Sequence, residues 1–391
     1  MKKRLLFVID SLGIGGAEKS LVTLLNLLDY TRYEVDLQLF AYGGTLEQFL
    51  PETVNVLPKL EISQYLSLPI WHQFLHFLRF CARMEYSWFI RERGQKPSDK
   101  ACIYWQTIGR HIGDFPIHYD VVIAYAQGVP SFYAIDKVSA NKKLLWINGN
   151  YCLTVKIRNF QHRFYKSCDT IVLVSDSVYR LFKKVYPEFE NKMHVMWDVT
   201  DSSTILKMSE LQSEVIIDKS LPVIVTVGRL VELKGYDLAL ETANILRNRG
   251  IKFYWYAIGE GPYRKKMEQY IQEHNLQNHF VLLGSSPNPY SYMRQCDIYV
   301  QTSRQEGFGL TIAEARILNK PVVCTNFEGC TMQIVNGKNG LITSFNPEDI
   351  ADAIERLLND KTLYSNIQEY LRNEKKGNIE EIEKFYELIE G

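Results

Sequence analysis

Residues 306–315 read EGFGLTIAEA, and this stretch is the most informative part of the chain. Its two carboxylates, Glu306 and Glu314, are eight residues apart, a little over two turns of helix, so both can face one cleft. Glycines break the chain before the helix, and the amides of Gly307 to Leu310 then lie at a helix N-terminus, which suits an anion. Carboxylates accept hydrogen bonds from sugar hydroxyls while amides hold a phosphate, so the pattern predicts a nucleotide-sugar site. The alternative is an ordinary amphipathic helix that carries two exposed glutamates.

The length of the chain predicts its number of domains, and its net charge bears on the partners that it can bind. The chain has 391 residues, which predicts two domains that each bury their own core. Its 45 basic side chains balance 45 acidic ones. A nucleic acid held by a net basic field is therefore not the expected partner.

Seven cysteines and eight histidines are scattered along the sequence without metal-ligand spacing. No Cys-x-x-Cys pair occurs, which is typical of reduced core thiols in a cytosolic protein without a metal site. The apolar run after Arg4 covers only residues 5–9 and is too short for a signal peptide. No run of about 18 apolar residues predicts a membrane-spanning helix. We therefore expect a cytoplasmic protein.

The N-terminal sequence predicts a strand, a glycine loop, a helix and a second strand. Residues 5–9 are continuously apolar, as in a buried parallel strand. A glycine loop follows at 13–16, then apolar residues at helical spacing over 17–28, then an alternating strand at 33–40. This order predicts a ligand at the carboxyl ends of the strands. Further strands are predicted at 121–125, 143–147 and 170–175.

The second half of the chain repeats this order. Strands are predicted at 223–227, 253–258, 280–283, 298–302 and 321–324. Helices are predicted near 236–249, 262–274, 310–319 and 347–358. Strands that alternate with helices imply parallel sheets, so the predicted fold class is α/β. The polar, turn-rich segment 196–220 is the predicted join between two domains.

Several motifs in order resemble one known family. Glu306-x7-Glu314 resembles the signature of the retaining glycosyltransferases of family 4. Arg229 and Lys234, which follow the strand at 223–227, resemble the family's phosphate-binding pair. The sequence GIGGAE at 13–18 resembles its N-terminal glycine loop. The resemblance runs from about residue 4 to the C-terminus and is densest over 222–345.

The resemblance implies the glycosyltransferase B fold, in which two Rossmann-like domains face each other across a cleft. Residues 1–197 would form the acceptor-binding domain, and residues 198–376 the domain that binds the nucleotide-sugar donor. Residues 377–391 would form a helix that crosses back to the first domain. From the residues alone, a solvated tail helix is equally open.

The resemblance also implies roles for individual residues. Glu306 would bind hydroxyls of the transferred sugar, Glu314 the ribose hydroxyls, and Arg229 with Lys234 the diphosphate. A guanidinium fork suits bidentate phosphate binding and an ammonium supplies a point charge, although both could be exposed loop charges. The residues expected in catalysis are Glu306, Arg229 and Lys234. Besides Glu314, the expected donor-binding residues are Gly15, Gly16, Asn148, Gly228, Gly259, Gly284, Gly307, Phe308, Gly309, Leu310 and Thr311.

The implied reaction is glycosyl transfer with retained anomeric configuration, in which the leaving phosphate helps to deprotonate the acceptor hydroxyl. Catalysis would then be mainly electrostatic, so neither a metal ion nor another cofactor is expected. The segment NPYSYM at 288–293 looks most like members that use uridine diphosphate (UDP) sugars. We expect hexosyl transfer from a UDP-sugar to a saccharide or lipid-linked acceptor, in the synthesis of a surface polysaccharide or glycolipid.

Three positions depart from the family's pattern. Asn148 stands where the family has a histidine that contacts the donor sugar, and an asparagine cannot carry that proton. Asp198 stands where Asn is usual, and Met332 or Gln333 replaces a family Glu. These changes bear on sugar identity and on turnover rate.

Residues 61–93 combine many aromatic side chains with several arginines and few acids. Helices that lie at a membrane interface have this composition. Helices packed on a sheet, with arginines reaching to water, have it too, and we expect core packing for most of the apolar residues. A strip that contacts the inner face of the cytoplasmic membrane would suit a lipid-linked acceptor.

Other functions fit parts of the sequence. A dehydrogenase fingerprint would need glycine where Glu18 stands, so that function is set aside. A nucleotide-sugar epimerase on the same fold and a catalytically silent partner subunit that binds a sugar nucleotide stay open. Slow hydrolysis of the donor without acceptor would separate an active transferase from a silent partner.

Overall fold

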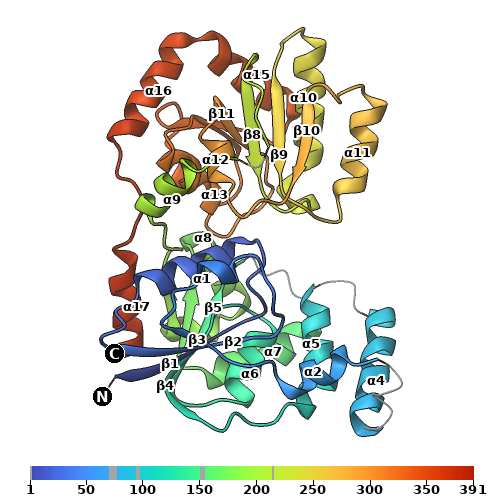
Figure 1. Ribbon diagram of the computed structural model, residues 1–391, viewed down its shortest axis with the longest axis vertical. Coiled ribbons are helices and arrows are strands. Elements are labelled where there is room, and N and C mark those ends of the chain that lie inside the picture. The colour runs from blue at the N-terminus through green and yellow to red at the C-terminus, as the bar shows by residue number, and fades with distance from the viewer. Residues whose placement is uncertain (1, 70–76, 94–96, 150–154, 214) are drawn as a thin grey trace. The chain divides into compact units, whose positions relative to one another are not determined.

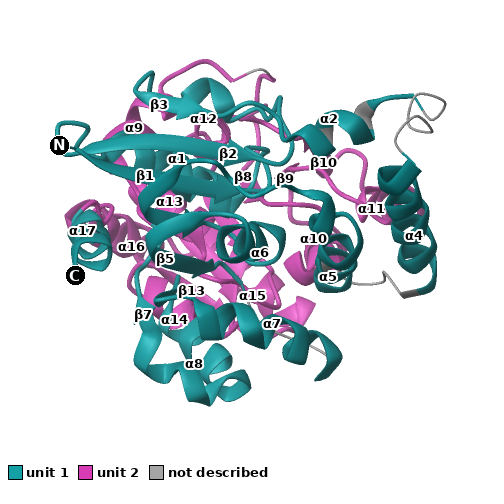
Figure 2. Cartoon of the chain, turned by 90° about the horizontal axis from the view of Figure 1, so that it is seen from below, with its two compact units in different colours: residues 1–198, 380–391 teal, residues 199–379 magenta. Residues whose placement is uncertain are grey.

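The computed structural model describes residues 2–69, 77–93, 97–149, 155–213 and 215–391. The chain divides into two compact units, which Figure 2 shows in different colours. Unit 1 contains residues 1–198 and 380–391, and unit 2 contains residues 199–379. The domain boundaries predicted from the sequence, 197/198 and 376/377, lie close to these.

Unit 1 is built on a sheet of seven parallel strands in the order β3-β2-β1-β4-β5-β6-β7. The strands are β1 (Lys3–Ile9), β2 (Tyr33–Leu39), β3 (Val54–Val56), β4 (His118–Ala124), β5 (Ser139–Ile147), β6 (Thr170–Leu173) and β7 (Met193–Val195). The central β1 is completely buried from Leu5 to Val8, which explains its continuous apolar run. All five strands predicted for this half are confirmed. The three-residue strands β3 and β7 were missed because they are too short to show a period.

Helices surround this sheet. They are α1 (Gly16–Leu27), α2 (Glu61–Ser67), α4 (Phe77–Arg93), α5 (Pro97–Thr107), α6 (Val129–Asp136), α7 (Val155–Ser167), α8 (Asp176–Val185) and α17 (Glu381–Glu390). Single 3₁₀ segments lie at η1 (Glu47–Phe49), η2 (Gly109–His111) and η3 (Pro187–Lys192). In both views α4 lies at the edge of the unit, with α5 between it and α6 (Figures 1 and 2).

The C-terminal helix α17 belongs to unit 1, although residues 199–379 of unit 2 precede it in the chain. Phe385 is fully buried, and its ring stacks on Phe7 of β1 at 5.9 Å between centroids. Tyr386 stacks on Tyr33 of β2 at 5.7 Å, and its hydroxyl accepts a hydrogen bond of 3.0 Å from the amide of Asp29. The alternative of a solvated tail helix is therefore wrong.

Unit 2 is built on six parallel strands in the order β10-β9-β8-β11-β12-β13. The strands are β8 (Val223–Val227), β9 (Tyr254–Ile258), β10 (Phe280–Gly284), β11 (Ile298–Gln301), β12 (Val322–Thr325) and β13 (Gly340–Thr343). Numbered within the unit, this is the order 3-2-1-4-5-6 of a Rossmann sheet, and the first six strands of unit 1 have the same order. The five strands predicted for this half are confirmed, and only the edge strand β13 was missed.

Helices cover both faces of the second sheet (Figure 1). They are α9 (Ser202–Ser209), α10 (Tyr236–Asn248), α11 (Arg264–Glu273), α12 (Tyr290–Met293), α13 (Leu310–Ile317), α14 (Cys330–Gln333), α15 (Pro347–Asn359) and α16 (Lys361–Asn373), with a 3₁₀ turn at η4 (Glu232–Lys234). Successive strand residues pack into different layers: Ile224 lies with α10 and α15, while Val225 lies with α12 and α13. This leaves the loops at the carboxyl ends of the strands to form a site. No helix in the described ranges is long and apolar enough to cross a membrane.

Candidate functional site

Three loops of unit 2 meet at the carboxyl ends of β8, β9 and β10. The amide of Gly228, after β8, donates to the carbonyl of Ile258 at 3.0 Å. The amide of Gly259, after β9, donates to the carbonyl of Gly284 at 2.7 Å. The three predicted glycines at 228, 259 and 284 are therefore neighbours along one edge of the sheet, where ligands bind in such folds.

Gly259 is required by this close approach. Its φ is +152°, and a Cβ atom there would lie 1.9 Å from the carbonyl oxygen of Gly228. At Gly228 itself a Cβ would meet nothing closer than 3.6 Å. Packing thus excludes a side chain at position 259 but not at position 228. At 228 the glycine leaves space at the edge of the sheet.

The Glu306 carboxylate accepts four hydrogen bonds from three side chains. Lys234 Nζ donates to both of its carboxylate oxygens at 2.7 Å. Its Oε1 also accepts from Ser303 Oγ at 2.6 Å and from Gln301 Nε2 at 2.8 Å. The Glu306 side chain is 10% exposed and that of Lys234 is 21% exposed. The carboxylate is thus fixed in orientation but remains partly open to solvent.

Gln301 and Ser303 are functional candidates that the sequence did not reveal. Gln301 is the last residue of β11 and is buried. Its side-chain oxygen accepts from Tyr299 OH at 2.6 Å and from Thr311 Oγ1 at 3.2 Å. The only sequence signal is a polar residue that closes an apolar strand.

The glycine turn after Glu306 is confirmed as the start of a helix. Gly309 has φ +84°, a left-handed conformation that side chains disfavour, and α13 begins at Leu310. Leu310 and Thr311 form the first turn of α13, whose leading amides have no partners within the helix. The carbonyl of Phe308 accepts a bond of 3.4 Å from Gln333 Nε2, so Gln333, one of the two residues that could replace the family's Glu, supports the turn.

Glu314 is 2% exposed, so the alternative of an ordinary helix with two exposed glutamates is wrong. Its Oε1 accepts from Tyr290 OH at 2.9 Å. Burial, and then the neighbouring Glu314 carboxylate, raises the pKa of Tyr290 well above its ordinary value. The phenol therefore stays protonated and acts as the donor to Glu314.

Arg229 differs from the other charged residues of the site because its side chain is exposed. It makes no ion pair or side-chain hydrogen bond with any residue that the structure describes. The flanking Leu230 is buried, and its amide donates to the carbonyl of Glu260 at 2.9 Å. The loop is thus anchored while the guanidinium is available to a ligand.

The predicted site residues of unit 1 lie at the carboxyl ends of β1 and β5. Gly15 precedes α1, which begins at Gly16, and a Cβ at Gly15 would lie 2.2 Å from the carboxylate of Glu18. Asn148 follows β5, and its Nδ2 donates to the carbonyl of Tyr125 at 2.7 Å. Its amide donates to Gln127 Oε1 at 2.9 Å, while its own Oδ1 is enclosed and finds no hydrogen-bond partner among the described residues.

Asp198, the second departure from the family, is buried at the last position of the first segment of unit 1. Burial raises its pKa to about 7, and a hydrogen bond with Ser20 opposes that rise. Ser20 Oγ also lies 2.9 Å from Tyr125 OH. An acid that titrates near neutrality thus stands where the family has a neutral amide.

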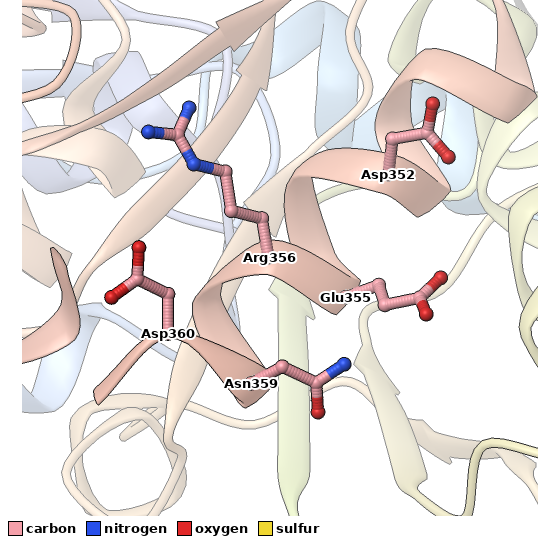
Figure 3. Close-up of a pocket in the computed structure, with 5 residues that line it drawn as sticks. All are labelled: Asp352, Glu355, Arg356, Asn359 and Asp360. Atoms are coloured by element: carbon pink, nitrogen blue, oxygen red, sulfur yellow. The ribbon is translucent and has the colours of Figure 1, made fainter. Parts of the chain in front are cut away.

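A shallow cavity of about 470 Å³ lies elsewhere in unit 2, along the C-terminal half of α15 (Figure 3). It is lined by Asp352, Glu355, Arg356, Asn359 and Asp360, whose side chains point in different directions. None of them was predicted as a site residue. Across the residues that the structure describes, no group of three or more His, Cys, Asp or Glu is arranged to hold a metal ion.

The second unit is similar to known sequences. Residues 208–374 match the family model described as glycosyl transferases group 1. An uncharacterized glycosyltransferase of Methanocaldococcus jannaschii is 34% identical over 37% of this chain and 40% of its own length. A second one from this organism is 26% identical over 65% of this chain and 73% of its own. The poly(ribitol-phosphate) alpha-N-acetylglucosaminyltransferase of Staphylococcus aureus is 34% identical over 35% of this chain and 28% of its own. The chain thus spans from about a quarter to three quarters of the lengths of these relatives.

Solved structures match over the whole chain. A glycosyltransferase from Rickettsia africae superposes with a TM-score of 0.69 at 20% identity, covering 100% of this chain and 98% of that one. Anabaena Alr3699/HepE in complex with UDP and glucose superposes with a TM-score of 0.68 at 18% identity, covering 100% of both. Residues 208–374 thus resemble the group 1 glycosyl transferases, and the two Rossmann-like units of the chain have the predicted glycosyltransferase B fold.

Proposed function

We propose that this protein transfers a hexose from a nucleotide-sugar to a saccharide or lipid-linked acceptor, with retention of anomeric configuration. The observation that carries the proposal is the arrangement at the edge of the second sheet. Lys234 and Arg229 follow β8, Glu306 follows β11, and these two strands are hydrogen-bonded neighbours. The two cations suit the diphosphate of a nucleotide-sugar. The oriented carboxylate suits the hydroxyls of its sugar.

Charge explains how these residues would promote transfer. Negative charge builds on the diphosphate as its bond to the sugar breaks, and the exposed Arg229 fork and Lys234 would stabilise it. Lys234 now lies on Glu306, so a bound diphosphate would share this cation with the carboxylate. Glu306 would accept hydrogen bonds from hydroxyls of the transferred sugar. No protein group is assigned as general base, and we propose that no metal ion is required.

A UDP-sugar is the proposed donor, and a surface polysaccharide or glycolipid the proposed product. The segment 288–293 supports the first point through its likeness to UDP-using members. The Anabaena relative was solved with UDP and glucose, and the Staphylococcus aureus relative acts on a poly(ribitol-phosphate). These are properties of the relatives, which make uridine nucleotides the first ligands to test here.

The helix α4 supports a peripheral membrane contact. Four of its apolar side chains, Phe77, Leu78, Met84 and Trp88, are each more than half exposed, and the charged Arg91 and Glu92 near its end are exposed too. Arg79, by contrast, pairs with Glu61 of α2. A helix that presents aromatic residues to the outside suits the interface of a bilayer. Residues 70–76, which the sequence also placed in this strip, lie outside the described residues. We propose the inner face of the cytoplasmic membrane as the place of action.

Hydrolysis of UDP-glucose and UDP-N-acetylglucosamine without acceptor tests the proposed function. The wild type should release UDP slowly. Arg229→Ala should release none while keeping the wild-type melting temperature, because its side chain is exposed. Glu306→Ala should also release none, and a single cooperative unfolding transition would show that it keeps the fold. Arg294→Ala is the matched control, because Arg294 is exposed and pairs only weakly with Glu210. Binding without release would favour the silent partner, and conversion of the sugar without release would favour the epimerase.

A further inference from the structure

Gln301 uses its whole hydrogen-bonding capacity within unit 2. The oxygen of its amide accepts from Tyr299 OH and Thr311 Oγ1, at 2.6 and 3.2 Å. Its Nε2 donates to Glu306 Oε1 at 2.8 Å and to Ser303 Oγ at 2.6 Å. An amide offers two donors and one oxygen with two lone pairs, so this side chain is satisfied on both ends.

The Glu306 carboxylate and the hydroxyl of Tyr299 together set which way the Gln301 amide points. Tyr299 is completely buried, and burial raises the pKa of its phenol well above the ordinary value, so the group stays protonated. This hydroxyl donates to Gln301 Oε1 at 2.6 Å and also lies 3.4 Å from the carbonyl of Val227. Because the Glu306 carboxylate only accepts hydrogen bonds, the amino group of Gln301 faces Glu306 and its oxygen faces Tyr299. A flipped amide would set its oxygen against the Glu306 carboxylate and lose two bonds.

The two oxygens of Glu306 consequently differ. Oε1 accepts from three donors: Lys234, Gln301 and Ser303. Oε2 accepts only from Lys234 within the part of the chain that the structure describes. A carboxylate has about four lone-pair sites in total, so the remaining capacity lies on Oε2.

We propose that Gln301 is a positioning residue for sugar transfer, which holds Glu306 Oε1 so that Oε2 accepts a hydroxyl of the transferred sugar. The inference rests on the proposed function of this site. It adds which oxygen of Glu306 meets the sugar and which side chain of this chain fixes it. Gln301 itself does not touch the substrate.

Gln301→Glu provides the sharpest test, because it keeps the shape of the side chain and replaces the donor with a second carboxylate. At alkaline pH the two carboxylates repel each other, and Glu306 loses its support. At lower pH one shared proton restores a donor between them. The kcat for donor hydrolysis should therefore fall by about tenfold or more near pH 8 and recover to within about threefold of wild type near pH 5.5. The affinity for UDP alone, which lacks the sugar, should change by less than about threefold.

A second variant tests the same inference at another residue, and a third serves as the control. Tyr299→Phe removes one of the two groups that orient the amide, and it should lower kcat at every pH without the acid recovery. Gln269→Glu is the matched control, because Gln269 lies on α11 of the same unit and donates to the carboxylate of Glu273, away from the site. It should keep the wild-type pH profile.

Two results would overturn the inference. One is wild-type kcat in Gln301→Glu across the pH range. The other is an equal loss at every pH together with loss of UDP binding, which would give Gln301 a merely structural role. A wild type that binds UDP but hydrolyses no donor would instead overturn the proposed function, and this inference with it.

Discussion

Glu306 and Lys234 form the ion pair on which the account of the site depends, and their environment explains its behaviour. The pair is only partly open to solvent, and the carboxylate has neutral donors in Ser303 and Gln301 besides the lysine. Loss of one partner of a buried pair leaves a charge uncompensated. Here the neutral donors soften that penalty for Glu306, so Lys234 can move to a diphosphate without leaving a bare carboxylate behind.

Asp198 should make the free energy of unfolding depend on pH. Its pKa is raised by burial to about 7, from an ordinary value of 3.8. The folded protein thus holds a proton that the unfolded chain releases, and the free energy of unfolding falls as pH rises from about 4 to 7. Asp198→Asn removes this dependence and should be more stable than wild type at pH 8 by as much as about 4 kcal/mol.

Urea denaturation of both proteins at pH 5 and pH 8 would check this prediction. The gap between variant and wild type should be much larger at pH 8 than at pH 5. A gap of the same size at both pH values would show that Asp198 is ionised in the folded protein.

The loop after β9 depends on the absence of a side chain at Gly259. Gly259→Ala would place a methyl group on the Gly228 carbonyl, so the loops after β8 and β9 would have to separate. We expect a loss of more than about 2 kcal/mol in the free energy of unfolding, together with loss of UDP binding.

Gly250→Ala separates the clash from backbone strain. Gly250 also has a positive φ, of +78°, but a Cβ added there would have no other atom within 4 Å. The substitution should cost only about 1 kcal/mol and leave UDP binding unchanged. Equal effects of the two substitutions would show that φ alone, and not the contact between loops, requires Gly259.

The helix α17 stabilises unit 1 through Phe385. This ring is fully buried and lies against Phe7 and Trp146. Phe385→Ala should lower the free energy of unfolding by about 3–5 kcal/mol, as is usual for buried aromatic residues. Phe345→Ala is the control, because Phe345 is 45% exposed and should cost less than about 1 kcal/mol. Similar melting temperatures for the two variants would contradict the packing described for α17.

Strands and site residues were predictable from sequence to different extents. The buried strands β1 and β8 show as apolar runs such as LLFVI and VIVTV, since both faces are covered. The three-residue strand β3 offers no period, and α16 was also missed. The role of Gln301 depends on the register of β11 beside Thr311 and Glu306, which no local pattern encodes. Gly259 was predicted for its closeness to a ligand, whereas its structural reason is a contact with the neighbouring loop.

The six strands of unit 2 and the first six strands of unit 1 have the same order, but the residues around the two sheets differ. Unit 2 places its charged residues at the ends of β8 and β11, while unit 1 carries the aromatic helix α4 at its edge. In the proposed function these features bind the nucleotide-sugar and bring the protein to a lipid-linked acceptor.

Vesicle binding tests the second of these roles. The wild type should sediment with vesicles of phosphatidylglycerol and phosphatidylcholine, and the double variant Phe77→Gln, Trp88→Gln should bind at least about tenfold more weakly. Ile216→Gln, at a residue 85% exposed in unit 2, is the control for loss of a surface apolar group. Equal sedimentation of all three proteins would mean that α4 does not contact the bilayer.

The central claim is that unit 2 binds a nucleotide-sugar through Arg229, Lys234 and Glu306. Calorimetric titration of the wild type and Arg229→Ala with uridine, guanosine and adenosine diphosphates tests it most directly. The wild type should bind UDP selectively, and Arg229→Ala should bind it at least about tenfold more weakly, because a charge-assisted contact to phosphate is lost. Binding of none of the three nucleotides, or equal UDP binding by Arg229→Ala, would contradict it.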